Sequence, residues 1–144
     1  MFEKLHRRYG RFAVDLAYAY DGNCLFHAVS YMYGNRISAG ALRCVACDFL
    51  SSQAFWNEFR DFLGSDWDAY VATMRRSGTW ADGFAITALT RVLRTHITVV
   101  SGTFSQTFRY KRPTNRRLFL ALEGSHYMPT RPMSEASVWK PHAR

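Results

Sequence analysis

The chain has 144 residues, of which 48% are hydrophobic and 16% aromatic, enough to form the hydrophobic core of one domain. We expect a single domain over residues 1–144, with the core of its fold at about 12–130. No stretch approaches the roughly 18 uninterrupted apolar residues of a membrane helix and the N-terminus lacks the apolar run of a signal peptide, so we expect no membrane partner and no classical secretion. Three cysteines are too few for a disulfide scaffold and odd in number, which indicates a reducing, cytoplasmic compartment. The net charge of +8 raises the question whether the protein binds an anionic partner.

The first predicted element is a short strand. Residues Phe12–Tyr20 alternate and carry β-formers, and they lead into the turn triplet Asp-Gly-Asn at 21–23. A helix then begins at or near Cys24 and stops near Gly34. The residues on either side of the core are predicted to be short, ragged termini.

Four more helices are predicted before the character of the sequence changes. One has the spacing of a single buried face, at Leu42, Val45, Ala46, Phe49 and Leu50. The other three lie at about 55–63, 67–74 and 82–94. Strands are then predicted at 95–101, 106–110 and 117–122, followed by a short extended piece that contains residues 125–127. This layout is an α+β arrangement.

The basic residues are spread over several segments, and only Arg109–Arg117 forms a block. The centre of this block, Pro113-Thr114-Asn115, indicates a turn with a solvated tip. An ordinary solvated surface is therefore favoured over a phosphate-binding patch, although a basic surface also suits an acidic part of a protein partner. A nucleic-acid binder ranks last, because nothing in the sequence pairs the arginines with a stacking platform of exposed aromatics.

The turn Asp21-Gly22-Asn23 and the cysteine that follows it have a chemical meaning. Such a turn can point successive backbone N–H groups into one concavity, as an oxyanion hole requires. Cys24 lies where the turn becomes a helix, and the positive end of a helix dipole favours the thiolate, which is the nucleophilic form.

A nucleophilic thiol needs a base, and imidazole is suited to that task at neutral pH. His27 is too close to Cys24 in sequence, and His96 opens a strand. His6 and His142 lie in the predicted termini, so His126, on a late edge segment, is best placed. From these residues alone a structural cysteine and a structural histidine remain the commoner interpretation.

Three blocks, in order, resemble the ovarian-tumour (OTU) family of cysteine proteases. DGNCLFHAVS at 21–30 resembles the family's cysteine box, which begins its catalytic helix. Gly78–Asp82, followed by the helical residues 85–89 and the strand 97–100, resembles its tryptophan segment. The pieces 118–120 and 126–127 resemble its penultimate strand and its catalytic histidine with an aromatic follower. The likeness spans roughly residues 18–127.

The resemblance implies a papain-like fold, with a helical N-terminal part packed on a small, mostly antiparallel sheet. It implies hydrolysis, without a cofactor or metal, of the bond at the C-terminus of ubiquitin or a ubiquitin-like modifier, through an acyl-enzyme on Cys24 with His126 as base. The amides of Asp21, Gly22, Asn23 and Cys24 would hold the oxyanion. The expected partners are ubiquitin, polyubiquitin chains or a related modifier, and the protein is expected to be monomeric. Candidates for the substrate groove are Trp80, Asp82 and Tyr127, with a core aromatic as the equal alternative for Trp80.

The third member of a catalytic triad is the point of departure from the family. Many members place Asp or Asn two residues after the histidine, to fix its tautomer and orientation, but here that position is Met128. Asp15, on the strand before the cysteine loop, is the substitute that we predict. The alternatives are that Asp15 is a strand-edge residue facing water, or that the site works as a dyad.

Other functions stay open beside the deubiquitinase. One is an OTU-like module that binds ubiquitin without cutting it, and another is a viral endopeptidase that processes its own polyprotein. The small size suggests a domain cut from a larger viral polypeptide, or a compact microbial effector acting in the host cytoplasm. Cys44 and Cys47 are predicted to be buried helical cysteines rather than zinc ligands or a redox pair.

Overall fold

The computed structural model describes residues 1–16 and 21–134. The predicted strand end at 17–20 and His142 lie outside the described residues. The helices are α1 (Phe2–Tyr9), α2 (Cys24–Met32), α3 (Ala39–Leu50), α4 (Gln53–Phe59), η1 (Arg60–Phe62), α5 (Trp67–Met74) and α6 (Gly83–Leu93). The strands are β1 (Arg11–Ala13), β2 (His96–Val100), β3 (Ser105–Phe108), β4 (Arg117–Glu123) and β5 (His126–Pro132).

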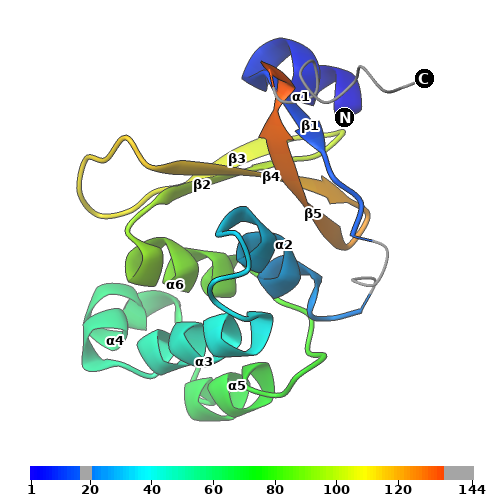
Figure 1. Ribbon diagram of the computed structural model, residues 1–144. Helices are drawn as coiled ribbons and strands as arrows, with labels where there is room; N and C mark the ends of the chain where they lie inside the picture. Colours follow the sequence, from blue (N-terminus) through cyan, green and yellow to red (C-terminus); the bar gives the residue numbers. More distant parts are fainter. Residues whose placement is uncertain (17–20, 135–144) are drawn as a thin grey trace.

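The five strands form one sheet in the order β1-β5-β4-β2-β3 (Figure 1). Only the β2–β4 pair is parallel, and the other three pairs are antiparallel. Because β2 lies between β3 and β4, the basic connection from 109 to 116 crosses the end of β2. The expected α+β fold with a mostly antiparallel sheet is confirmed.

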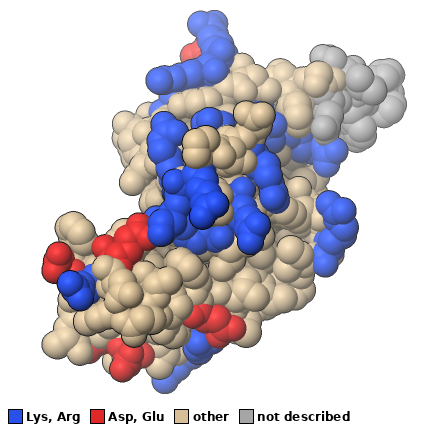
Figure 2. Space-filling view, turned by 90° about the vertical axis from the view of Figure 1, so that its left-hand side faces the viewer, with Lys and Arg blue, Asp and Glu red and all other residues tan. Residues whose placement is uncertain are grey.

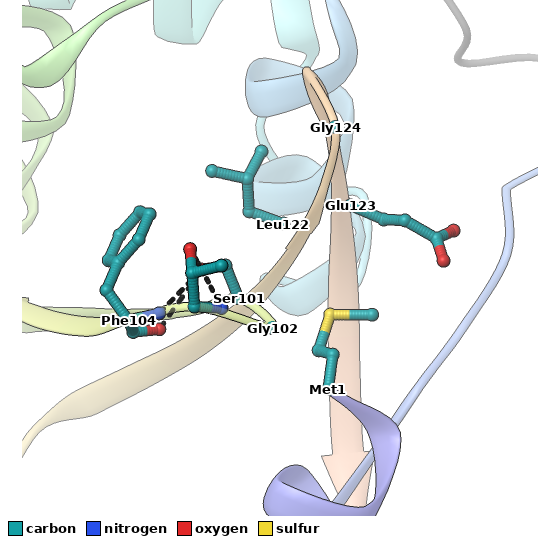
Figure 3. Close-up of a pocket in the computed structure, with 8 residues that line it drawn as sticks. Met1, Ser101, Gly102, Phe104, Leu122, Glu123 and Gly124 are labelled. Atoms are coloured by element: carbon teal, nitrogen blue, oxygen red, sulfur yellow. Dashed lines mark hydrogen bonds between the residues drawn. The ribbon is translucent and has the colours of Figure 1, made fainter.

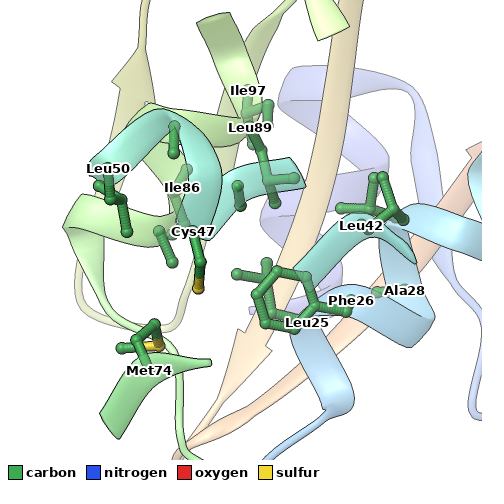
Figure 4. Close-up of a cluster of buried hydrophobic side chains, with 14 of the residues drawn as sticks. Leu25, Phe26, Ala28, Leu42, Cys47, Leu50, Met74, Ile86, Leu89 and Ile97 are labelled. Carbon is green, nitrogen blue, oxygen red and sulfur yellow. The ribbon is translucent and has the colours of Figure 1, made fainter. Parts of the chain in front are cut away.

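Helices α2 to α6 cover one face of the sheet, and α1 lies on the other (Figure 1). The larger core fills the space under the first face, where α2, α3 and α6 meet the sheet through side chains that include Phe26, Leu42, Leu89 and Ile97 (Figure 4). A smaller core joins Leu5 of α1 to Val100, Ala121 and Met128 on the second face. The sheet is therefore covered on both sides, and successive residues of β5 contact the helices on opposite faces of the sheet.

Two expectations about local structure are corrected. The N-terminus is not ragged, because residues 2–9 form α1, which ends at Gly10 with a φ of 62° and buries Leu5 completely. The buried face of α3 is also rotated from the predicted one. Val45 is 40% exposed, and Arg43 and Cys47 are buried in its place. The reason is that the Arg43 side chain has hydrogen-bond partners inside the protein.

Candidate active site

The sulfur of Cys24 lies against the backbone on both sides of His126. Cys24 is the first residue of α2, and its Sγ accepts a hydrogen bond from the Tyr127 N–H at 3.3 Å. The same Sγ lies 3.7 Å from the Ser125 carbonyl oxygen, to which the thiol donates. The thiol is only 2% exposed. The fold thus brings together the cysteine and the histidine that the sequence singled out.

His126 is placed by a tight turn. Strands β4 and β5 pair with Glu123 opposite His126, so that only Gly124 and Ser125 connect them. Gly124 has a φ of 63°, a conformation that glycine adopts without strain and that two-residue hairpin turns require. His126 is 8% exposed at the first position of β5.

Burial raises the pKa of the Cys24 thiol, because the charged thiolate loses solvation in this position. The N–H of Tyr127 is the largest influence in the opposite direction, and the amides of Leu25 and Cys24 at the start of α2 also lower the pKa. The charge of Asp21 raises it further. The balance favours the neutral thiol, so a base must remove its proton before the sulfur can attack.

The loop before Cys24 is held by its own polar side chains. The Asp21 carboxylate accepts a hydrogen bond from the Asn23 N–H at 2.9 Å, and the Asp21 carbonyl accepts one from the Cys24 N–H at 3.2 Å. The Asn23 side chain accepts from the Gly78 N–H at 2.8 Å and donates to the Ser77 hydroxyl at 3.2 Å. Asn23 therefore joins the loop to the segment before Trp80.

Gly22 makes the closest approach between these two segments. A Cβ atom on Gly22 would lie 1.7 Å from the Gly78 carbonyl oxygen and 3.0 Å from the Thr79 carbonyl carbon. Both are backbone atoms that cannot rotate away. The glycine of the cysteine box is thus required by the contact of the loop with residues 78–79.

Arg43 is a site residue that the sequence did not reveal. It is 4% exposed, and its guanidinium lies 4.5 Å from the centre of the Phe26 ring. Its four oxygen acceptors, at 2.7 to 3.2 Å, are the Met74, Gly22 and Thr79 carbonyls and the Asn23 side-chain oxygen. Arg43 therefore joins the loop before Cys24, the end of α5 and the segment before Trp80. An arginine flanked by core positions of a helix is the signal that would have found it.

The three residues predicted for a substrate groove differ in their surroundings. Trp80 is 49% exposed, so its side chain is not a core aromatic. Tyr127 is half-buried and packs against the small cluster of Leu16 and Cys24. The Asp82 carboxylate caps α6 by accepting from the Phe84 and Ala85 N–H groups, and it also accepts from the Tyr70 hydroxyl. Asp82 therefore has a structural task in this fold.

Asp15 follows β1, and its side chain is exposed. The pairing of β1 with β5 continues past Ala13, because the Val14 N–H donates to the Pro129 carbonyl at 2.9 Å. Met128, in the position where many family members have Asp or Asn, is buried in the core under α1.

A pocket of about 460 Å³ lies beside the turn that precedes His126 (Figure 3). It is lined by Met1, by the 101–104 turn, and by residues 122–124 at the end of β4 and the start of the turn that follows. Within the residues that the structure describes, no cluster of three or more His, Cys, Asp or Glu side chains is arranged to bind a metal ion. In the same part of the chain, no helix has the length and apolar character needed to cross a membrane.

The pair Cys44 and Cys47 is only partly as predicted. Cys47 is buried in the main core, but Cys44 is exposed and lies 4.0 Å from the Asp48 carboxylate. The prediction of two buried thiols was therefore wrong for Cys44. The rotation of α3 that buries Arg43 turns Cys44 toward solvent.

Comparison with known proteins points to one family. The family model described as OTU-like cysteine protease matches residues 19–130. No curated protein matches the sequence. Among solved structures, the OTU domain of OTUD1 is similar with a TM-score of 0.72 at 21% identity, over 89% of this chain and 90% of that one.

Two viral structures are also similar. The OTU domain protease of Dera Ghazi Khan virus has a TM-score of 0.66 at 18% identity, over 85% of this chain and 81% of that one. The Hazara virus OTU, solved bound to ubiquitin, has a TM-score of 0.58 at 23% identity and the same two coverages, 85% and 81%. At these identities the likenesses show the fold.

Proposed function

Because the chain belongs to the family of OTU-like cysteine proteases, we propose that it is a deubiquitinase. It would hydrolyse the isopeptide or peptide bond at the C-terminus of ubiquitin or a ubiquitin-like modifier. The observation that supports this most is the contact of the Cys24 sulfur with the backbone on both sides of His126. The Hazara virus OTU bound to ubiquitin adds support for the substrate class.

The proposed reaction has two steps. His126 removes the proton of the Cys24 thiol, and the sulfur attacks the carbonyl carbon of the scissile bond. The tetrahedral intermediate collapses to a thioester on Cys24 as His126 gives that proton to the leaving amine. A water molecule then loses a proton to His126 and attacks the thioester, which releases the carboxylate and restores the thiol.

The oxyanion of the intermediate is assigned to the loop Asp21–Asn23 and the amide of Cys24. The N–H groups of Asn23 and Cys24 both donate to Asp21 in the free protein, so these two bonds are exchanged for the oxyanion when the intermediate forms. The Asn23 side chain meanwhile fixes the loop against Gly78. One donor to an oxyanion commonly contributes about 3 kcal/mol to lowering the barrier.

Two acids are candidates to orient His126. The register that pairs Val14 with Pro129, continued by one residue, places Asp15 beside Met128 and diagonal to His126. Diagonal neighbours across an antiparallel pair lie about 7–8 Å apart, with their Cβ atoms somewhat closer, a span that an aromatic side chain such as the His126 imidazole can reach across. Glu123 is directly opposite His126 on β4. We assign the task to Asp15, and Glu123 is the competing acid.

Trp80 and Tyr127 are assigned to the groove that receives the modifier's C-terminal tail. Trp80 is exposed two residues after Gly78, which contacts the loop before Cys24. Tyr127 packs beside the sulfur itself. These observations support a place for both aromatic side chains at the border of the site of the scissile bond.

The decisive experiment is incubation of the folded protein with ubiquitin that has a C-terminal propargylamide. We expect a covalent adduct on Cys24, located by peptide mass spectrometry, and none in Cys24→Ala. Cys44→Ser is the matched control, because Cys44 is the exposed thiol and must not be the one that reacts. If the protein binds ubiquitin but forms no adduct, it is a ubiquitin-binding module and not a deubiquitinase. A panel of ubiquitin-like probes would define the modifier.

A further inference from the structure

A group of cations separated in the sequence lies together at one end of the sheet. We name it the basic patch, and it consists of Arg94, Arg109, Lys111, Arg112, Arg116 and Arg117. Arg94 directly follows α6, four members from Arg109 to Arg116 lie in the β3–β4 connection, and Arg117 begins β4. Figure 2 faces the side of the molecule on which that connection lies in Figure 1, and it shows Lys and Arg side chains gathered over the centre of this face.

The sheet topology explains why these residues meet. His96, the first residue of β2, pairs with Arg117 on one side. On the other side Ile97 pairs with Phe108, so the next residue of that strand, Arg109, comes level with His96. Neighbouring strands are about 4.8 Å apart, and Arg109 and Arg117 are therefore about 10 Å apart at their backbones. The basic residues that are separated in the sequence therefore lie together on a surface about two strand spacings wide.

The charge of the patch is largely uncompensated. Glu58 lies 3.7 Å from Lys111, but it is already engaged by the two terminal guanidinium nitrogens of Arg91 at 2.6 and 2.7 Å. Within residues 1–16 and 21–134, no carboxylate forms an ion pair with the five arginines of the patch. All six side chains belong to exposed residues.

The pKa of the buried His96 is affected by the positive charge of the patch. Burial lowers the pKa of His96, and the charges of Arg117 and Arg109 lower it further. The neutral ring accepts a hydrogen bond at Nδ1 from the Tyr110 N–H at 2.9 Å, which ties the start of the connection to β2. The cations are therefore presented on a fixed end of the sheet rather than only on a loose loop.

The composition of the patch favours phosphates over a protein surface. Protein interfaces are centred on apolar or aromatic anchors, whereas nucleic-acid interfaces are more polar and much more positive. Large exposed apolar side chains among the described residues are at Phe2, Val45, Trp56, Phe62, Trp80 and Phe104, and none belongs to the patch. Five of its six cations are arginines, whose planar fork suits phosphate oxygens.

We propose that the basic patch binds the phosphate backbone of a nucleic acid. The fold brings the dispersed arginines to one end of the sheet, and we assign base stacking to the half-buried Tyr110, which lies between Arg109 and Lys111 in the chain. The patch is separate from the candidate active site. Strand β4 runs from Arg117 to Glu123, and the steps of about 3.3 Å between successive residues place its two ends about 20 Å apart.

The test is fluorescence anisotropy of a labelled 20-nucleotide single-stranded RNA titrated with the whole chain, with single-stranded DNA and duplex RNA as further arms. About five phosphate contacts give a slope of log affinity on log salt near −3.5, hence a roughly 100-fold weaker affinity at 200 mM than at 50 mM salt. Arg112→Glu with Arg116→Glu should weaken binding at least about tenfold and make the slope shallower by about 1.4.

The matched control is Arg8→Glu with Arg76→Glu, which changes the net charge equally at two exposed positions outside the patch. Arg109→Gln with Arg117→Gln repeats the test if the first pair of changes disturbs the loop, and a thermal melt verifies the fold of each variant. Equal loss in the control pair, or a salt slope near zero, would overturn the proposal. Tighter binding of a 20-residue polyglutamate than of RNA would also overturn it, in favour of an acidic protein partner.

Discussion

The backbone N–H of Tyr127 donates a hydrogen bond to the sulfur of Cys24 across 103 positions of sequence, at 3.3 Å. This contact fixes the start of α2 against the start of β5. It also gives the thiol a partner that favours the thiolate, although burial outweighs it and the pKa of Cys24 stays raised. The sulfur is held in place before it is activated.

The first prediction concerns the alkylation of Cys24 by iodoacetamide in the free protein. Because the pKa of the thiol is raised, the thiolate is a small fraction at neutral pH, and that fraction grows about tenfold for each pH unit below the pKa. We expect the alkylation rate of Cys24, followed by peptide mass spectrometry, to rise without a plateau from pH 6 to 9. A plateau at pH 6 to 7 would mean that a thiolate–imidazolium pair exists before substrate binds.

The second prediction is that Gly22→Ala inactivates a folded protein. The added Cβ would meet the Gly78 carbonyl oxygen at 1.7 Å, so the loop before Cys24 must move away from residues 78–79. A displacement of about 1 Å at a reacting group can cost roughly 100-fold in rate. We expect such a loss in kcat/KM on a fluorogenic ubiquitin substrate.

The control for this change is Gly40→Ala. Gly40 lies in α3, and a Cβ there would meet no atom within 4 Å, so alanine should stabilise the helix by about 0.5–1 kcal/mol and leave kcat unchanged. Full activity of Gly22→Ala would show that the loop can move without consequence for the reaction.

The third prediction is that Arg43 positions the loop. Lysine keeps the charge but cannot reach four acceptors at once, so Arg43→Lys should lower kcat at least about tenfold and stability by about 3 kcal/mol. Urea unfolding and steady-state kinetics give the two values. Arg75→Lys is the control, since its ion pair with Asp48 is exposed and worth less than about 1 kcal/mol. If the change lowers stability but leaves kcat of the folded protein intact, Arg43 is merely structural.

Elements with a strong local pattern could be predicted from the sequence. The helix that begins at Cys24 ends at Met32, two residues before the expected end near Gly34, and the helix predicted at about 67–74 is α5. The strand after α6 is also correct to within one residue at each end. In these segments apolar spacing, turn residues and β-branched residues all favour the same state.

Features that depend on distant partners could not be predicted. Arg43 is a polar residue on a helix, and only its acceptors at Gly22, Met74 and Thr79, which lie 21 to 36 positions away in sequence, explain its burial. For the same reason the spacing of apolar residues misplaced Val45. The basic patch is a further case, because the sequence shows scattered arginines and only the parallel pairing of β2 with β4 brings Arg117 level with His96.

The fourth prediction decides which acid orients His126. In Asp15→Asn the side chain keeps its shape but loses its charge, so an imidazolium formed during the reaction would lose its counter-charge. We expect kcat on a fluorogenic ubiquitin substrate to fall at least about tenfold with little change in KM. Glu123→Gln is the matched change, because Glu123 faces His126 across the hairpin and also lines the neighbouring pocket. A loss in Glu123→Gln with full activity in Asp15→Asn would transfer the role to Glu123, and full activity in both would mean that Cys24 and His126 work as a dyad.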